Sequence, residues 1–357
     1  MVRLGMPALR RLTLAALISA FALAAQAQER PFQFALVGDM PYSKVEEQEF
    51  DRVIAQMNAK ELAFVIHVGD MQNDPRPHNR NTADSAVPCT DAMNDWLVAK
   101  FATIRHPFVV TPGDNDWTDC HLLRSQKVDP LERLDALRKT FYPEGRSLGG
   151  RTIPVESQSA DPQHSKFREN LRWSVGGVTF ATLHITGSND NAGRSPEMDA
   201  EQKERKAANL IWLKQAFARA RAGNSRGLVI MTQANPAFEN SWEMNRKTLM
   251  FNRVLGINPP NPPVPTAFED YINALASEME SYDKPVAFLH GDTHMFRIDQ
   301  PLYSARTNRP FENFTRVETF GSPNSHWVLV TVDPADPQLF RFQAQIVPGN
   351  VANHRKN

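Results

Sequence analysis

The chain has 357 residues, and its 40 Lys and Arg side chains are balanced by 40 Asp and Glu side chains. A net charge of zero provides no long-range field to attract nucleic acid or an anionic membrane, and the aromatic residues are not interleaved with a basic stripe. Nucleic acid is therefore not expected as a partner. A chain of this length can bury one large α/β core or two smaller ones.

The first 27 residues have the pattern of a secretory signal peptide. Arg3, Arg10 and Arg11 form a basic region, residues 12–25 are apolar, and Ala25-Gln26-Ala27 fits a cleavage site. The apolar run is short and rich in Ala for a membrane span, although an uncleaved anchor is the alternative. We expect the mature chain to be periplasmic or secreted, with no stable membrane anchor after cleavage.

The first half of the mature chain alternates between apolar runs and segments of helical periodicity. Phe50, Val53, Ile54 and Met57 illustrate the helical spacing. Alternating strands and helices are typical of a parallel sheet with right-handed crossovers. The predicted elements are strand 32–37, helix 46–60, strand 64–68, helix 91–104 and strand 108–110.

The second half is less regular and becomes rich in strands toward its end. Gly176-Gly177 separates two apolar runs, which indicates a hairpin. Long loops are expected at 144–163 and, over the site, at 237–265. The predicted elements are helix 131–141, strands 171–175 and 178–185, helix 201–222, strand 228–231, helix 268–279, strand 285–289 and a β-meander within about 296–347. We expect one α/β domain over 28–357, with two mixed sheets packed face to face and helices outside.

The sequence contains two cysteines, Cys89 and Cys120. In an oxidising compartment a lone pair of cysteines more often bridges than not, and two buried free thiols are the alternative. A disulfide would tie the segment that follows the third predicted strand to the start of the helix at 91.

Four predicted strands end in the same dipeptide. Glycine lets the chain turn sharply, and the aspartate then projects over the edge of the sheet. One such aspartate is commonly a turn residue or a helix cap. Four on one edge would repel one another, and a multivalent cation is the simplest agent to hold them together. The four pairs are Gly38-Asp39, Gly69-Asp70, Gly113-Asp114 and Gly291-Asp292.

The order of these motifs resembles the calcineurin-like metallophosphoesterases, the family that includes purple acid phosphatases. The resemblance covers about 32–298 and rests on Asp39, Gly69-Asp70, Gly113-Asp114-Asn115-Asp116 and Gly291-Asp292-Thr293-His294. It implies a four-layer α-β-β-α sandwich with two divalent metal ions at the sheet edge. In that family the metals bind phosphate and activate a water for in-line attack.

Several motif positions depart from the family. Pro41 replaces a histidine of the first motif, Asp114 and Asn115 replace Asn and His of the third, and Gln233 and Asp292 replace later histidines. The resemblance still implies a ligand set with Asp70 as the bridge. A one-residue shift would instead make Asn115 the amide ligand. The implied metal ligands are Asp39, Asp70, Asp114, Gln233, Asp292 and His294.

This ligand set is richer in oxygen than is usual for the family. Oxygen ligands suit Mg, Mn or Ca better than Zn, and the identity of the metal stays open among Mn, Fe, Zn and Mg. Asn115 occupies the position of the family's catalytic histidine. His184, before a Gly-Ser-Asn turn, and His290 are the candidates to replace that imidazole partly.

We therefore expect an exported metal-dependent phosphoesterase that hydrolyses a small phosphomonoester or phosphodiester through a metal-activated water. The alternative is a non-catalytic or weakly active ligand-binding protein on the same fold, with a degenerate metal site. The missing histidines favour the alternative, and the retained aspartates oppose it.

Overall fold

The computed structural model describes residues 30–73, 75, 87–123, 127–238 and 267–351. The expected signal segment and most of the expected loop at 237–265 lie outside these residues. Within the described ranges, no helix combines the length and the apolar character needed to cross a membrane.

The first sheet has six strands, and its centre is parallel. β1 pairs in parallel with β2, and β2 pairs in parallel with β3. The strands lie in the order β13 (Phe340–Gln345), β12 (Trp327–Val332), β1 (Phe32–Val37), β2 (Val65–His67), β3 (Pro107–Val110) and β4 (Leu148–Gly149).

The second sheet has seven strands, and β7, β8, β9 and β11 run parallel in it. Its order is β10 (Arg297–Asp299), β11 (Phe314–Glu318), β9 (Val286–His290), β8 (Gly227–Met231), β7 (Val178–Thr182), β6 (Leu171–Val175) and β5 (Glu156–Ser157).

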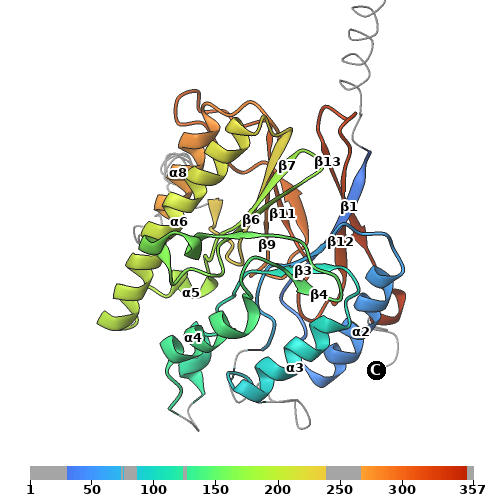
Figure 1. Cartoon of the computed structure of the whole chain (residues 1–357), viewed down its shortest axis with the longest axis vertical. Helices are drawn as coiled ribbons and strands as arrows, with labels where there is room; N and C mark the ends of the chain where they lie inside the picture. The colour runs from blue at the N-terminus through green and yellow to red at the C-terminus, as the bar shows by residue number, and fades with distance from the viewer. Residues whose placement is uncertain (1–29, 74, 76–86, 124–126, 239–266, 352–357) are drawn as a thin grey trace, which may run out of the picture.

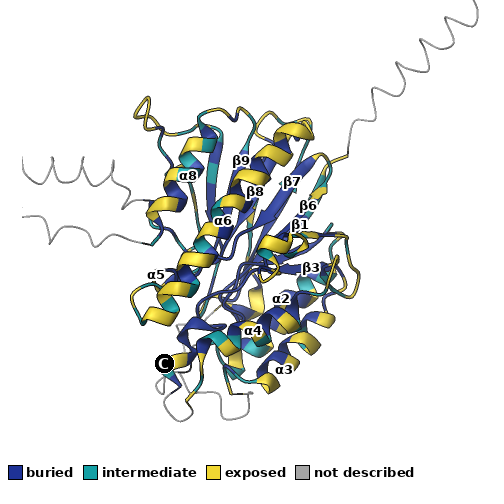
Figure 2. Cartoon of the chain, turned by 60° about the vertical axis from the view of Figure 1, so that its left-hand side comes forward, coloured by how far each residue is buried: buried dark blue, intermediate teal, exposed yellow. Residues whose placement is uncertain are grey.

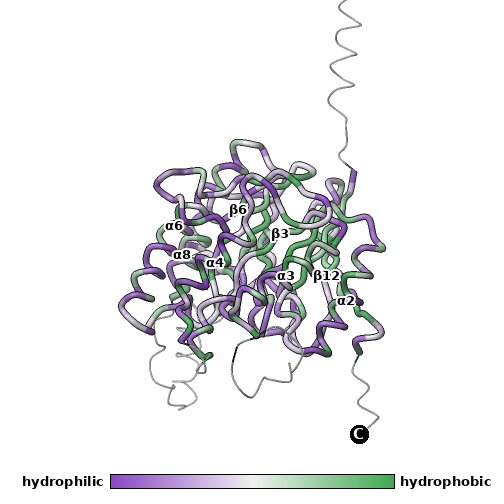
Figure 3. The backbone as a smooth tube through the Cα atoms, turned by 60° about the horizontal axis from the view of Figure 1, so that its bottom comes forward, coloured by the Kyte–Doolittle hydropathy of each residue, from purple (hydrophilic) through white to green (hydrophobic). Residues whose placement is uncertain are grey.

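Helices cover the outer faces of both sheets, which gives the four-layer α-β-β-α sandwich (Figures 1 and 2). α6 and α8 pack on the seven-stranded sheet, and α2 and α3 pack on the six-stranded one. Figure 3 shows the hydrophobic stretches gathered in the strands and the hydrophilic stretches along the helices. The helices are α2 (Lys44–Asn58), α3 (Asp91–Ala102), α4 (Pro130–Phe141), α5 (Gly187–Asp190), α6 (Pro196–Ala222) and α8 (Glu269–Met279).

The central strands are apolar on both faces because each face is covered. In β8, Val229 and Met231 belong to the core between the sheets, whereas Leu228 and Ile230 pack in the cluster beneath α6 and α8. Aromatic rings join the sheets across that core, with Phe180 of β7 centred 5.6 Å from Phe34 of β1. Burial on both faces explains why these strands appear in the sequence as unbroken apolar runs.

The expected C-terminal meander is wrong. β10 and β11 belong to the seven-stranded sheet, where β11 pairs in parallel with β9, whereas β12 and β13 belong to the six-stranded sheet. β12 pairs antiparallel with β1, about three hundred residues away in sequence, and so covers the edge that β1 would otherwise expose. Alternating apolar residues identify a strand but do not specify its partner.

The long segment predicted as a loop at 144–163 also contains regular structure. It carries the short strands β4 and β5 and two 3-10 turns, Gln158–Ala160 and Pro162–His164. Each strand has only two residues, which is too short for an alternating pattern to be visible in the sequence.

The expected disulfide is confirmed. Cys89 and Cys120 are bonded, with their Cα atoms 5.7 Å apart. Cys120 lies in the 3-10 turn Thr118–Leu122, which follows the loop that carries Asp114, and Cys89 lies just before α3. The bond therefore fastens that loop to the six-stranded half of the molecule.

We predict that replacing both cysteines by alanine lowers the free energy of unfolding by about 3–4 kcal/mol, because the bond closes a loop of about thirty residues in the unfolded chain. Chemical denaturation of the oxidised protein and of the variant measures the difference. Reducing the wild-type protein should produce the same loss. Equal stability of the variant and the oxidised protein would show that the bond does not form.

Candidate metal centre

The ends of five parallel strands meet at a seam between the two sheets. Asp39, Asp70 and Asp114 follow β1, β2 and β3 of the six-stranded sheet. Gln233 follows β8, and Asp292 and His294 follow β9, both of the seven-stranded sheet. Carboxyl ends of parallel strands are where open α/β sheets place ligands, and here two such edges face each other.

Hydrogen bonds cross the seam and join the two sets of residues. The Asp292 N–H donates to both carboxylate oxygens of Asp39, at 3.0 and 3.1 Å. Gln233 Nε2 donates to Asp114 Oδ1 at 3.1 Å. His294 Nε2 lies 3.6 Å from Asp39 Oδ1, and its Nδ1 contacts the carbonyl of Ser322 at 2.6 Å. The structure thus brings Asp39, Asp114, Gln233, Asp292 and His294 together.

Asp70 lies at the centre of the six-stranded half of the seam. Its Oδ1 accepts from the Asn115 N–H at 3.0 Å, and its Oδ2 accepts from the Tyr42 hydroxyl at 2.9 Å. The Tyr42 ring meets the His294 ring edge to face, with the centroids 5.4 Å apart. Tyr42 therefore links Asp70 to His294.

The glycines of the repeated dipeptide make room for the aspartates of neighbouring strands. A Cβ on Gly113 would collide with the carboxylate of Asp70, and a Cβ on Gly291 would collide with the carboxylate of Asp39. The second contact joins strands of different sheets. Glycine is thus needed at positions 113 and 291 because Asp70 and Asp39 occupy the space that a side chain there would take.

The backbone is strained at these residues. Asp39, Asp70, Asp292 and His294 all have positive φ, at 53°, 54°, 84° and 62°. Left-handed backbone is uncommon outside glycine, and such outliers cluster at functional sites. The chain therefore turns sharply at the ends of β1, β2 and β9, where these side chains lie in the seam.

Asp116 supports the site through the backbone. Its Oδ2 accepts from the N–H groups of Asp70 and Gly113, at 3.0 and 2.8 Å, and its Oδ1 accepts from Met71 at 2.8 Å. One buried carboxylate therefore joins the loop after β2 to the loop after β3. Sequence analysis placed Asp116 in the motif but did not reveal this role, because the partners are main-chain groups.

Burial and like charge raise the pKa values of the carboxyl groups. Burial and the negative charge of Asp292 raise the pKa of Asp39 well above its usual value, and burial with Asp114 and Asp39 does the same for Asp70. Burial and Asp119 raise the pKa of Asp114. Burial and Asp114 raise the pKa of Asp292 to about 7. The cluster therefore resists full ionisation unless positive charge accompanies it.

A polar rim borders the cluster on the side of α5. The exposed Ser188 hydroxyl lies 2.8 Å from Asp114 Oδ2 and 3.0 Å from Asp119 Oδ1, and Arg194 Nη2 donates to Asp119 Oδ1 at 2.6 Å. Ser188 begins a run of four residues with positive φ that ends at Asn191. Sequence analysis noted the Gly-Ser-Asn turn after His184 but did not identify Ser188, Asp119 or Arg194.

The expectation that His184 or His290 faces the cluster is corrected by their contacts. Both ring nitrogens of His184 have buried partners, Glu169 at 2.8 Å and Trp117 at 3.1 Å. The His290 ring is fully buried, and its Nδ1 contacts the carbonyl of Gly291 at 2.8 Å. His290 follows Val286 and Phe288 in the two-residue period of β9, which directs its side chain to the helix-covered face.

Asn115 does lie in the site, through its main chain. Its N–H donates to Asp70, and its carbonyl faces the sulfur of Cys89 at 3.9 Å. The expected role of its side chain in catalysis stays a prediction.

The donor set fits a hard divalent cation by its chemistry. Among the described residues, no three His, Cys, Asp or Glu side chains are already arranged as a metal-binding group. However, Asp39, Asp70 and Asp114 are buried carboxyl groups whose charges oppose one another, and oxygen ligands of this kind suit Mg²⁺ or Mn²⁺. Asp114 Oδ2 and Asp292 Oδ1 each lie 2.7 Å from the point where Gly187 would carry a Cβ, so the glycine leaves the space between them free.

Solved structures of two known proteins match most of this chain at low sequence identity. A structure of PhoD matches 86% of this chain and 65% of its own chain, with a TM-score of 0.53 and 15% sequence identity. A crystal structure of 5'-nucleotidase from Candida albicans matches 87% of this chain and 50% of its own, with a TM-score of 0.40 and 11% identity. No family model matches the sequence, and no curated protein sequence matches it significantly. The match to PhoD shows that this chain shares the two-sheet sandwich fold of that structure, and this chain spans less than two thirds of the length of each matched structure.

We predict that Asp292→Asn stabilises the metal-free protein increasingly as the pH rises. The folded pKa of Asp292 is about 7, above its unfolded value, so the folded state loses stability between about pH 4 and pH 7 as this group ionises. Asparagine does not ionise and keeps an oxygen that accepts from the Asn235 N–H.

Thermal unfolding in the presence of a chelator should show nearly equal stability of the two proteins at about pH 4. Above about pH 7, Asp292→Asn should be the more stable protein. Asp95→Asn, at an exposed position of α3, is the control and should show no such trend. A difference between Asp292→Asn and wild type that does not change with pH would contradict the raised pKa.

Proposed function

We propose that this chain is a metal-dependent phosphoesterase that hydrolyses a phosphomonoester or a phosphodiester. The observation that carries the proposal is the meeting of Asp39, Asp70, Asp114 and Asp292 at one seam. The fold shared with PhoD and the order of the motifs, which resembles the metallophosphoesterases, support the same conclusion.

Two groups of residues would hold the cations, with Asp70 common to both. Asp39, Asp70 and His294 form one group, and Asp70, Asp114, Gln233 and Asp292 form the other. When bound, divalent cations polarise phosphate oxygens and bring the pKa of a water toward neutrality. The predominance of oxygen ligands favours Mn²⁺ or Mg²⁺ over Zn²⁺.

The surrounding residues orient the ligands and meet the substrate. The Tyr42 hydroxyl orients the Asp70 carboxylate, and the Asp292 N–H orients that of Asp39. At the rim, the exposed Ser188 hydroxyl and the partly exposed Arg194 guanidinium would donate hydrogen bonds to the phosphate. The seam is otherwise acidic, so this guanidinium would help an anionic ester to approach.

Export of the chain is part of the proposal. The signal-like pattern of residues 1–27 supports it, and the Cys89–Cys120 disulfide is typical of an oxidising compartment.

A ligand-binding protein without turnover is the second candidate. Asn115 stands where the resembled family has its catalytic histidine. The His184 ring is held by Glu169 and Trp117, and the His290 ring is fully buried. Loss of an acid–base imidazole costs about 10²–10⁴-fold in rate, which weakens catalysis without preventing binding.

We predict that Asp70→Asn abolishes phosphoesterase activity and lowers the metal content, while the fold is retained. Asparagine keeps the shape of the side chain but removes the charge that would offset two cations. The purified mature protein and the variant would be assayed on aryl phosphate monoesters and diesters with Mn²⁺, Mg²⁺, Zn²⁺ and Fe²⁺, and metal content would be measured by elemental analysis.

The surface variant Asp95→Asn should keep both activity and metal. Full activity in Asp70→Asn with unchanged metal content would mean that the chemistry lies elsewhere. A wild-type protein that binds metal but hydrolyses no ester with any of the cations would favour the binding protein.

A further inference from the structure

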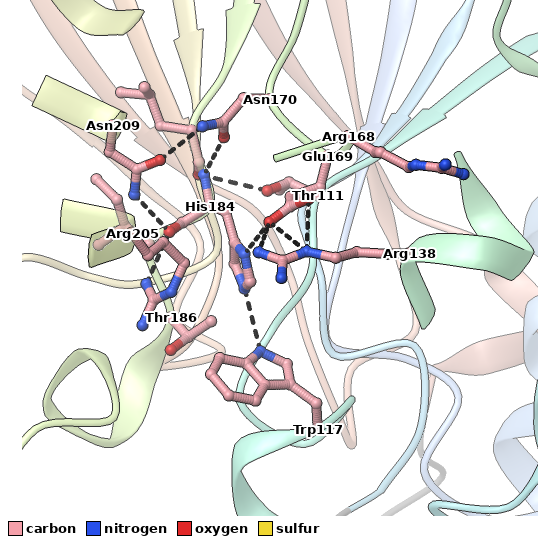
Figure 4. A network of polar contacts seen from close by, with 12 residues as sticks. Thr111, Trp117, Arg138, Arg168, Glu169, Asn170, His184, Thr186, Arg205 and Asn209 are labelled. Atoms are coloured by element: carbon pink, nitrogen blue, oxygen red, sulfur yellow. Dashed lines mark hydrogen bonds and ion pairs between the residues drawn. The ribbon is translucent and has the colours of Figure 1, made fainter. Parts of the chain in front are cut away.

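Figure 4 shows a network of polar side chains that leads through Trp117 to the loop after β3. Arg138 of α4 holds the Glu169 carboxylate with Nη2 2.6 Å from Oε1 and Nε 3.0 Å from Oε2. Glu169 Oε1 lies 2.8 Å from His184 Nδ1, and the Trp117 indole N–H donates to His184 Nε2 at 3.1 Å. Glu169, His184 and Trp117 are fully buried.

The partners select one tautomer of His184. An indole nitrogen can only donate, so Nε2 must accept, and the ring proton therefore lies on Nδ1 and is donated to Glu169. Burial opposes ionisation of Glu169, but the Arg138 charge overcomes it and lowers the pKa of that carboxyl group. A carboxylate, a neutral imidazole and an indole thus form a directional series in which every polar atom has a partner.

His184 is anchored through its main chain as well as through its ring. The main-chain N–H of His184 donates to Asn170 Oδ1 at 2.9 Å. The main-chain carbonyl of His184 accepts from Asn209 at 2.7 Å and from Arg205 at 2.9 Å, both of α6. The ring is therefore held by the seven-stranded sheet and its helix layer. Trp117, in contrast, belongs to the loop that follows β3 of the other sheet.

Trp117 is joined closely to the ligand loop. Its main-chain N–H donates to the carbonyl of Asp114 at 3.3 Å. Asp116 directly precedes Trp117, and its carboxylate accepts from the N–H groups of Asp70 and Gly113. Trp117 is therefore directly connected to the hydrogen bonds that join both loops.

We infer that the Trp117–His184 hydrogen bond is a positioning contact that sets the loops carrying Asp114 and Asp70 against the opposite sheet. The inference rests on the proposed function for its consequence in catalysis, but not for the contact itself. Burial alone does not explain the contact, because the buried indole nitrogens of Trp173 and Trp212 have no hydrogen-bond partner among the described residues.

The test compares two Trp→Phe variants that remove the same atoms. Trp117→Phe removes the hydrogen bond. Trp173 is also buried and stacks on Phe180 with the ring centroids 5.4 Å apart, but its indole nitrogen has no hydrogen-bond partner among the described residues, so Trp173→Phe is the matched control. Hydrogen exchange of the Asp70, Met71 and Gly113 amides reports the loops directly, without metal or substrate. We expect Trp117→Phe to lower their protection by about tenfold, the factor for one lost buried hydrogen bond, and Trp173→Phe to leave it unchanged.

In the metal-loaded protein, Trp117→Phe should also lower Mn²⁺ affinity or kcat by about 10–100-fold, with the KM for the ester little changed. Equal effects of the two variants on amide protection would overturn the inference. Absence of activity in the wild-type protein would count against the proposed function alone, because the amide measurement stands without it.

Two substitutions at His184 keep the test decisive if Trp117→Phe does not fold. Glutamine places an oxygen where Nε2 accepts the indole proton, whereas asparagine can replace only the Nδ1 donor to Glu169. His184→Gln should therefore retain more amide protection than His184→Asn. Equal loss in both, or greater loss in His184→Gln, would contradict the role of the indole bond.

Discussion

Repulsion among four neighbouring aspartates is the constraint on which the rest of this site depends. Asp39, Asp70 and Asp114 are buried, and Asp292 lies against them from the other sheet. Like charges at such positions cost free energy unless protons, hydrogen-bond donors or cations offset them. The fold supplies donors at every carboxylate, from the backbone at Asp39 and Asp70 and from Gln233 and Ser188 at Asp114. Burial and like charge raise the pKa values of Asp39 and Asp70 despite these donors, which favours a cation as the complement of the cluster.

The supporting structure is concentrated in one short loop. Between Gly113 and Cys120, successive residues attach to different parts of the molecule. Asp116 binds the backbone of the loop after β2, Trp117 reaches His184 in the other sheet, and Cys120 is bonded to Cys89 before α3. A loop fastened to both sheets can hold Asp114 in place although the site straddles the space between them. Such support by groups behind the ligands commonly governs metal affinity.

Sequence patterns predict the parts of this molecule whose signal is local. The strand at 32–37 coincides with β1, and the helix at 131–141 differs from α4 by one residue at its start. The two-sheet architecture and the meeting of the Gly-Asp ends follow from strand order and from the motifs.

Contacts between distant residues have no such signal in the sequence. The pairing of β12 with β1, the buried partners of His184 and the three backbone groups held by Asp116 all depend on packing. His184 therefore resembled a site residue in the sequence, since a histidine at a strand end has the same pattern whether it faces a ligand or a tryptophan.

The most direct test of this account is a titration of the metal-free protein with Mn²⁺ in weak buffer, with simultaneous measurement of heat and of released protons. The titration is done at about pH 6.5, just below the pKa of about 7 of Asp292. Carboxyl groups that retain protons because they are buried and repel one another must lose them to bind a cation. The account predicts saturable binding accompanied by proton release, and the loss of both in Asp70→Asn. Binding of Mn²⁺, Mg²⁺ or Zn²⁺ without proton release, or no binding up to millimolar concentrations, would contradict the claim that the seam is a metal centre.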